Sequence, residues 1–436
     1  MICKLKKTCF KVISVKQTLN PKFHLGLATY LWFSLIRFFQ LICIFFFFLP
    51  HITHAQTRGD LPFELKSGDR VVFLGNALME NEQMYNYLEF RLSRHWPERN
   101  ITFRNLGWSG DNVYGEARSY YTSPPSAYDL LISQLTDSKP THVLVAYGSV
   151  EAQEGEGGLE TFAKGLEKLL TKIQELGAEA ILLSPIPQFA GGTPSLLVER
   201  NNNLKLYAKK IAQIAQGNQK RYIDLFSPFE KLAESELISE NGLHLTEYGY
   251  YKLAEFVENA LGLNTDPWMI SVDARSGKIE SKLITNMVIS DPKNKKLEFT
   301  VDEKILPVAI PNSLNRESDR PIAIQGLKKG FYSLEINGKL VASASAKAWA
   351  EGVSLQQGGT LDQADHLSSL LKKKDEVFFY QYRPLNRTYI IGFREYEQGR
   401  HASDLRDFDI VLTWLQGQIT ATKLPVRTHY KLYPTP

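Results

Sequence analysis

Between residues 68 and 262, short runs of apolar residues alternate with longer stretches in which apolar positions recur every three or four residues. The short runs end at Gly, Pro or Asn and predict buried strands, whereas the longer stretches have the period of amphipathic helices. The predicted strands are Val71–Leu74, Ile101–Leu106, His142–Tyr147, Ala180–Ser184 and Tyr222–Leu225, and the predicted helices are Glu82–Trp96, Leu130–Leu135, Leu159–Leu176, Leu204–Ala215 and Tyr248–Leu261. This alternation predicts an α/β fold, in which a parallel sheet is covered by helices on both faces.

The pattern changes after Asn264. Strand-like runs follow, and the pair Asn337-Gly338 predicts a tight hairpin, because these residues adopt the positive φ angles that such a turn needs. The expected strands are Met269–Val272, Lys296–Val301, Phe331–Ile336, Glu376–Tyr382 and Thr388–Phe393, with a helix at Leu361–Lys374. We therefore predict an α/β domain over residues 56–265 and a second, β-rich domain with a helical element over residues 266–436.

The first 55 residues have a different composition. They contain no Asp or Glu, carry seven Lys or Arg residues, and end in an apolar run followed by Thr53-His54-Ala55. A basic region, a short apolar run and small residues before a cut are typical of a secretory signal, which predicts cleavage after Ala55 and a secreted or periplasmic protein. The alternative is a retained membrane anchor, because apolar character begins near Leu25 and the segment spans a bilayer if Arg37 is tolerated.

Removal of this segment changes the charge and the cysteine count. Without its seven basic residues, 44 Lys and Arg face 47 Asp and Glu, which is a net charge of −3 in place of +4. Nothing in that balance indicates a nucleic-acid surface. Cys3, Cys9 and Cys43 all lie in the segment, so the remaining chain has no disulfide, no cysteine nucleophile and no thiolate metal site.

Polar or glycine-containing blocks follow the predicted strands. The run Val71–Leu74 leads into Gly75-Asn76-Ala77, and three further blocks are Trp108–Asp111, Gly148–Glu151 and Asn241–His244. Parallel sheets bind ligands at the carboxyl ends of their strands. We therefore expect the four blocks to gather at one edge of the sheet.

In this order, the four blocks resemble those of the SGNH or GDSL hydrolases, over about residues 68–262. The resemblance implies a flavodoxin-like, three-layer fold and ester hydrolysis by a serine, with backbone and asparagine donors for the oxyanion and a late Asp-x-x-His. It places the oxyanion glycine at Gly110 and the base at His244. The serine position falls on Ala77, the asparagine position on Val150 and the aspartate position on Asn241.

These differences remove the usual mechanism. Alanine has no lone pair for attack, valine has no side-chain donor, and Asn241 orients His244 through its amide oxygen at most, without stabilising an imidazolium by charge. Asn76 also replaces the aspartate of Gly-Asp-Ser. The Gly-Asn-x block and the C-terminal extension resemble a divergent subgroup of secreted bacterial SGNH-like proteins.

Other residues offer alternative chemistry. Ser109 and Ser149 are candidate nucleophiles, although a serine beside glycine more often hydrogen-bonds its own turn. Asp111, Glu116 and Glu151 are candidate acids or bases; the alternatives are a turn cap for Asp111, and a partner of Arg118 or exposure to solvent for Glu116. No spacing typical of a metal site occurs, and we predict neither a metal nor another cofactor.

The stretch Tyr380–Leu405 is rich in aromatic and polar residues, among them Arg383, Asn386 and His401. Stacking faces beside planar polar groups suit sugar recognition. An amphipathic hairpin with ordinary surface ion pairs explains the stretch equally well.

Two functional hypotheses follow. In the first, an exported hydrolase acts on an ester, for example an acetyl ester of a polysaccharide, with water activated by His244 and the oxyanion held by Gly110. In the second, a degenerate hydrolase scaffold binds a carbohydrate or another partner without turnover. Both predict a small-molecule or glycan ligand and no nucleic acid; membrane association is expected only if the N-terminal segment is uncleaved, and the pattern does not predict an oligomeric state.

Overall fold

A computed structural model describes residues 62–119, 125–233, 238–263, 268–278, 281, 284–291, 296–309, 311, 320–384, 394, 396 and 401–435. The predicted signal and its cleavage site lie outside the described residues. Within the described ranges, no helix combines the length and the apolar character that a membrane span requires.

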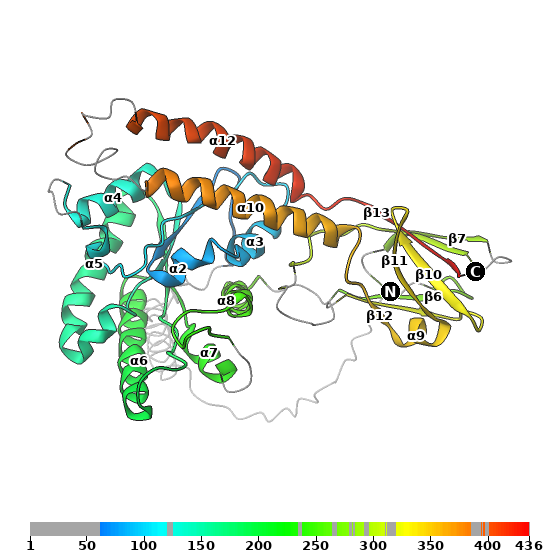
Figure 1. Ribbon diagram of the computed structural model, residues 1–436, viewed down its shortest axis with the longest axis horizontal. Helices are drawn as coiled ribbons and strands as arrows, with labels where there is room; N and C mark the ends of the chain where they lie inside the picture. The colour runs from blue at the N-terminus through cyan, green and yellow to red at the C-terminus, as the bar shows by residue number, and fades with distance from the viewer. Residues whose placement is uncertain are drawn as a thin grey trace, which may run out of the picture. The chain divides into compact units, whose positions relative to one another are not determined.

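The first half of the described chain forms the predicted parallel sheet, with strand order β2-β1-β3-β4-β5 (Figure 1). The strands are β1 (Arg70–Gly75), β2 (Thr102–Asn105), β3 (His142–Ala146), β4 (Glu179–Leu183) and β5 (Arg221–Ile223). Val71 in β1 pairs with Phe103 in β2 and with His142 in β3. The flavodoxin-like α/β fold is therefore confirmed.

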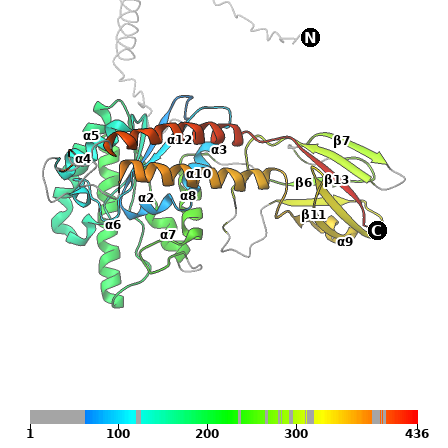
Figure 2. The ribbon, with the colours of Figure 1, turned by 45° about the horizontal axis from the view of Figure 1, so that its top comes forward.

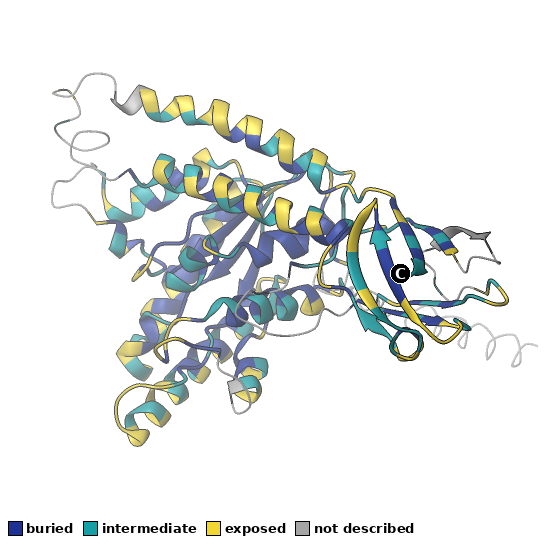
Figure 3. Ribbon diagram, turned by 45° about the vertical axis from the view of Figure 1, so that its right-hand side comes forward, coloured by how far each residue is buried: buried dark blue, intermediate teal, exposed yellow. Residues whose placement is uncertain are grey.

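Two apolar clusters cover the two faces of this sheet. Successive strand residues point to opposite faces, so Val72 and Leu74 join one cluster whereas Val71 and Phe73 join the other. The flanking elements are α2 (Ala77–Glu82), α3 (Tyr87–Arg94), η2 (Glu116–Arg118), α4 (Ala127–Asp137), η3 (Glu151–Gly158), α5 (Leu159–Glu175), α6 (Pro194–Gly217), α7 (Phe226–Ala233) and α8 (Glu247–Ala260). Figure 3 shows the buried strands between helices whose outer surfaces are exposed, which confirms the three layers.

Two helix boundaries differ from the expected ones. The helix predicted at Glu82–Trp96 begins later, as α3 at Tyr87, because Asn86 adopts a left-handed conformation with φ +61°; Glu82 is the last residue of the preceding helix α2. Helix α6 begins at Pro194 and not at Leu204; Thr193 caps it by accepting the N–H of Leu196. Thr-Pro is a good start for a helix, because proline at the first position lacks only an N–H that would be unpaired there.

The second half contains antiparallel strands, as predicted. One sheet has the order β11-β10-β13-β8-β7, and a smaller one has the order β12-β9-β6. The strands are β6 (Ile270–Asp273), β7 (Ile284–Asp291), β8 (Lys296–Val301), β9 (Pro321–Gln325), β10 (Phe331–Ile336), β11 (Lys339–Ser345), β12 (Val353–Ser354) and β13 (Thr428–Pro434), with α9 (Ala346–Glu351) beside them. Asn337 and Gly338 form the predicted hairpin turn with φ +51° and +80°.

Two long helices of this half pack on the α/β region. They are α10 (Thr360–Tyr382) and α12 (His401–Thr422), which lie side by side in both views (Figures 1 and 2). Helix α10 contacts α3 and β2. The prediction of a strand at Glu376–Tyr382 is wrong, because the helical spacing of buried residues that includes Leu367 and Leu371 continues through Phe378. Thr388–Phe393 lies outside the described residues.

Candidate active site

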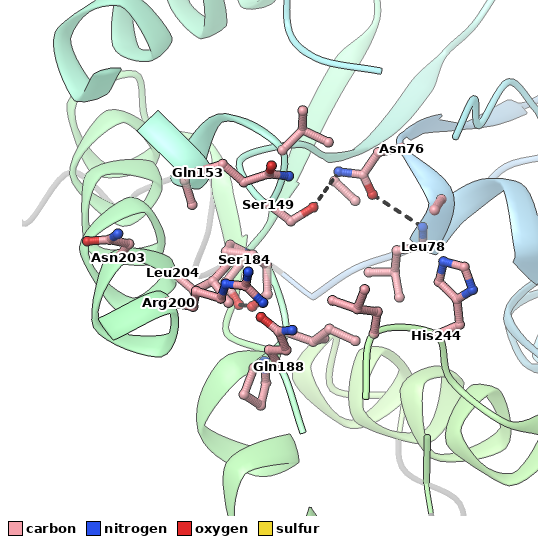
Figure 4. A pocket seen from close by; sticks show the side chains of 18 of the residues that line it. Asn76, Leu78, Ser149, Gln153, Ser184, Gln188, Arg200, Asn203, Leu204 and His244 are labelled. Atoms are coloured by element: carbon pink, nitrogen blue, oxygen red, sulfur yellow. Dashed lines mark hydrogen bonds between the residues drawn. The ribbon is translucent and has the colours of Figure 1, made fainter. Parts of the chain in front are cut away.

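A cavity of about 580 Å³ opens at the carboxyl ends of β1, β3 and β4 (Figure 4). Its walls come from the segments that follow these strands, 76–78, 146–150 and 184–188, and from helix α6. Gly110 and His244 also line it. The blocks that the sequence placed at strand ends therefore meet at one cavity, as the topology of a parallel sheet requires.

Asn76 connects two of these blocks. Its side-chain oxygen accepts the N–H of Leu78 at 3.2 Å and so caps helix α2. Its amide nitrogen donates to the hydroxyl of Ser149 at 2.7 Å. Ala77 follows as the first residue of α2 and lines the cavity with its methyl group. Val150 likewise contributes an apolar side chain to the wall.

Gly110 lies in a loop that is pressed against α2. The residue has φ +79°, which is readily accessible only to glycine, and its N–H makes no hydrogen bond to any described residue. Trp108 fixes the loop by donating its N–H to the carbonyl of Gly75 at 2.9 Å. A Cβ at Gly107 would collide with the backbone nitrogen of Glu80. The close approach brings the loop of Gly110 next to Ala77.

Asn241 does not hold His244 in the expected way. Its side-chain oxygen accepts the backbone N–H groups of Leu243 at 3.0 Å and of His244 at 2.9 Å. The amide nitrogen therefore faces the ring, 3.5 Å from Nδ1 of His244. An amide NH₂ only donates, so this contact, at the limit of a hydrogen bond, favours Nδ1 as the acceptor and the proton of the neutral ring on Nε2. This tautomer is the reverse of the one that an aspartate imposes, and it makes Nε2 a donor instead of a base.

Asp111 and Glu116 do not line the cavity, although Tyr147, a partner of Asp111, does. Asp111 is fully buried; it pairs with Nε of Arg118 at 2.8 Å and accepts the hydroxyl proton of Tyr147 at 2.9 Å. It is thus neither a turn cap nor a cavity residue. Glu116 is exposed, in line with the solvent alternative, and accepts from the side chain of Asn112 at 2.7 Å.

Glu151 ties two loops together. Its carboxylate accepts the N–H of Val113 at 3.0 Å and the N–H of Gly148 at 2.8 Å. Burial raises the pKa of Glu151 to about 6, although these backbone hydrogen bonds act in the opposite direction. Because the side chain does not line the cavity, the geometry favours a role in holding the loops over a role as an acid.

The two candidate serines occupy different environments. Ser109 is exposed outside the cavity lining, and its backbone N–H donates to the carboxylate of Glu80. Ser149 lines the cavity, and its hydroxyl accepts from Asn76. Among the described residues, no carboxylate or imidazole hydrogen-bonds this hydroxyl, so nothing there activates it for attack.

Two residues of the aromatic-polar stretch contact the loop of Gly110 outside the cavity. Arg383 forms an ion pair with Glu80 at 2.8 Å and stacks over Trp108, while Tyr382 donates its hydroxyl proton to the carbonyl of Gly107 at 2.7 Å. Neither residue lines the cavity; both support the loop of Gly110 from its far side. Asn386 lies outside the described residues. His401 begins α12, and its side chain is not among those described.

Polar residues that the sequence did not single out complete the cavity. Arg200 and Asn203 come from α6, and Gln153 comes from η3 (Figure 4). Arg200 and Asn203 are three positions apart and so share a helix face. Thr193-Pro194 is a helix-start signal. A helix predicted from that signal would have included Arg200 and Asn203 and shown that they share one face.

Comparisons with known proteins place this site in a family context. Residues 71–252 match the model of the GDSL-like lipase/acylhydrolase family, and no curated protein matches the chain. Among solved structures, a gut microbial diltiazem-metabolizing enzyme is similar with a TM-score of 0.67 and 17% identity, over 85% of this chain and 99% of that chain. An acetylxylan esterase from Geobacillus stearothermophilus is similar with a TM-score of 0.38 and 17% identity, over 46% of this chain and 98% of that chain. The first likeness shows a shared fold that extends beyond the α/β region.

Proposed function

Since residues 71–252 form a GDSL-like lipase/acylhydrolase domain of the SGNH superfamily, we propose that this chain is an exported glycan-binding protein built on a hydrolase domain. In this proposal the cavity holds a carbohydrate ligand and does not cleave it by an acyl-enzyme route. The family is one of hydrolases, and the resemblance that the sequence indicated is confirmed.

The relationship between Asn241 and His244 carries this proposal. A serine hydrolase needs the lone pair of Nε2 to take the proton of its nucleophile. Here the amide nitrogen of Asn241 faces Nδ1, which leaves the proton on Nε2. Ala77 and Val150 also line the cavity. In this proposal they stand at the positions of the serine nucleophile and of the asparagine that donates to the oxyanion, so the nucleophile, the base and this donor are all altered.

The composition of the cavity supports ligand binding. Leu78, Ile186 and Leu243 provide apolar wall, while Ser149 and Gln153 provide polar groups. Apolar walls with a few convergent polar groups are typical of small-molecule sites, and a volume of about 580 Å³ lies in their usual range.

A second candidate function is ester hydrolysis by water. Gly110 and His244 line the same cavity, so an ester carbonyl held by the N–H of Gly110 would lie in the same cavity as the imidazole. This route requires the opposite tautomer of His244, with Nε2 as the acceptor.

The two candidates are separated by measuring binding and acetate release with the same protein. We expect the chain from residue 56 onwards to bind members of a panel of acetylated and unacetylated oligosaccharides in calorimetry, and to release no acetate. Acetate release by the unmodified protein that disappears in His244→Ala would establish the hydrolase instead. Absence of binding to every oligosaccharide would reject the glycan-binding proposal.

A reconstruction provides a positive control. The triple variant Ala77→Ser, Val150→Asn, Asn241→Asp restores the family's residues around Gly110 and His244, so slow acetate release is expected from it and not from Ala77→Ser alone. Export is tested separately: the protein isolated from its native host should begin at Gln56, and retention of residues 1–55 would favour the anchor.

A further inference from the structure

The cavity is lined by hydrogen-bond donors. The hydroxyl of Ser149 already accepts from Asn76, which leaves its own proton to donate. Gly110 contributes an N–H with no partner among the described residues, and His244 presents Nε2–H. A cavity lined by these donors matches a ligand that is rich in hydrogen-bond acceptors.

The lining carries one side chain of each charge. Arg200 is its one guanidinium, and Glu199 is its one carboxylate among the described residues. Two further carboxylates, outside the lining, have partners of their own: Asp111 pairs with Arg118, and Glu151 accepts two backbone N–H groups. The family's aspartate is absent too, because position 241 is asparagine. An anion entering the cavity therefore does not meet the repulsion that an aspartate at position 241 would exert.

Arg200 is placed to receive such an anion. Figure 4 shows its guanidinium turned into the cavity from α6, beside Gln188. Neither Arg200 nor Asn203 nor Gln153 makes a side-chain hydrogen bond within the described part of the chain, so their donors remain for a ligand. The amide of Gln188, in contrast, is used by the carbonyl of Ala190 at 3.0 Å.

We propose that Arg200, Asn203 and Gln153 form a subsite for the carboxylate of an acidic sugar, a uronate unit of a polysaccharide. The planar fork of arginine matches a carboxylate with two parallel hydrogen bonds, and the amides of Asn203 and Gln153 reach neighbouring hydroxyls. The sugar ring extends toward Ala77 and Ser149. This inference rests on the proposed glycan binding and names the class of glycan.

The test compares three ligands by calorimetry on the chain from residue 56 onwards: trigalacturonate, a neutral galactotriose and triglutamate. We expect trigalacturonate to bind about tenfold more tightly than galactotriose, which corresponds to one charge-assisted hydrogen-bonded contact. Arg200→Gln should remove this preference and leave the affinity for galactotriose within about twofold. Lys209→Gln, which removes an exposed positive charge of the same helix outside the cavity lining, should leave the preference unchanged.

Each other outcome is decisive. Equal affinity for trigalacturonate and galactotriose, unaffected by Arg200→Gln, overturns the subsite while glycan binding stands. Arg200-dependent binding of triglutamate as tight as that of trigalacturonate overturns the sugar and leaves only a carboxylate site. Failure of both sugars to bind rejects this inference together with the proposed function. Arg200 is exposed on α6, so Arg200→Gln is expected to fold normally. An unchanged temperature of thermal unfolding confirms that this variant is folded.

Discussion

The guanidinium of Arg383 lies 4.1 Å from the ring centroid of Trp108 and pairs with Glu80 at 2.8 Å. Glu80 also accepts the N–H of Ser109, so the cation at the end of α10 supports the loop of Gly110 on two sides. A residue far along the chain thus helps to set the geometry of a cavity that it does not line.

Arg383→Ala should weaken ligand binding more than it weakens the fold. The lost stacking and partly buried ion pair contribute about 1 kcal/mol to the free energy of unfolding, whereas the loop beside the cavity loses its support. Urea unfolding and calorimetric titration measure the two effects. Arg427→Ala removes an exposed ion pair with Asp302 that does not touch this loop, and should leave ligand affinity unchanged; equal effects of both variants on affinity would contradict the prediction.

Gly107→Ala should destabilise the α/β region by about 2 kcal/mol, because its Cβ meets the backbone of Glu80 and the loop must move. Gly217→Ala is the matched control. Nothing lies within 4 Å of a Cβ at Gly217, which ends α6, so this change should be neutral or stabilising by up to about 1 kcal/mol. Denaturant midpoints of the two variants give the comparison, and equal midpoints would argue against the close approach.

Lys374→Met should destabilise the packing of α10 on the α/β region by about 3–5 kcal/mol. Lys374 is fully buried between Glu89 and Asp375, and donates to the carbonyl of Phe103 at 3.3 Å. Burial raises the pKa of Glu89, and the ammonium group opposes that shift. Without the ammonium group, two buried carboxyl groups lose their cation.

The charge explanation is tested by a second variant. Lys374→Met combined with Glu89→Gln and Asp375→Asn removes the unpaired anions, so it should recover a large part of the lost free energy of unfolding. No recovery would mean that the loss comes from packing alone.

Stability should fall in acid through Glu258. Burial opposes the ionisation of this carboxyl, but His95 at 2.6 Å, Arg94 at 2.8 Å and Arg91 outweigh it and lower its pKa from 4.5 to about 2. A lowered pKa in the folded state gives stabilisation that is complete above the unfolded value of about 4.5 and is lost as the pH falls through about 2. The shift corresponds to roughly 3 kcal/mol.

The variant Glu258→Gln should be less stable near neutral pH and should lack this part of the acid dependence. Glu255→Gln, on the same helix but in a half-exposed pair with Lys252, should retain it. Denaturant unfolding between pH 2 and pH 7 provides the measurement, and parallel curves for Glu258→Gln and the unmodified protein would exclude Glu258 as the source.

Asn241→Asp should reverse the tautomer of His244. One carboxylate oxygen can keep the N–H groups of Leu243 and His244, and the other then accepts the proton of Nδ1. Nitrogen NMR at alkaline pH should show unprotonated Nδ1 in the unmodified protein and unprotonated Nε2 in the variant. An unprotonated Nε2 in the unmodified protein would undermine the argument against a base at this position.

The hydrophobic pattern alone predicted the parallel sheet and the β-rich character of the second half, and the Asn-Gly pair predicted one antiparallel hairpin. Strand period, helix period and the Asn-Gly turn are local properties, so they are visible in short windows of sequence. The block around Ala77 is contiguous, so the prediction that alanine stands at the serine position also comes from a short window, and it stays a prediction. Export after Ala55 stays a prediction.

Tertiary structure decided what those residues contact. Phe378 and Tyr382 belong to a helix because side chains with helical spacing there pack against α3 and β2. These elements are distant in sequence, so no short window of sequence contains them. Arg200 reached the cavity because α6 begins ten residues earlier than its apolar spacing indicated, and a cavity wall is assembled from segments that are distant in sequence.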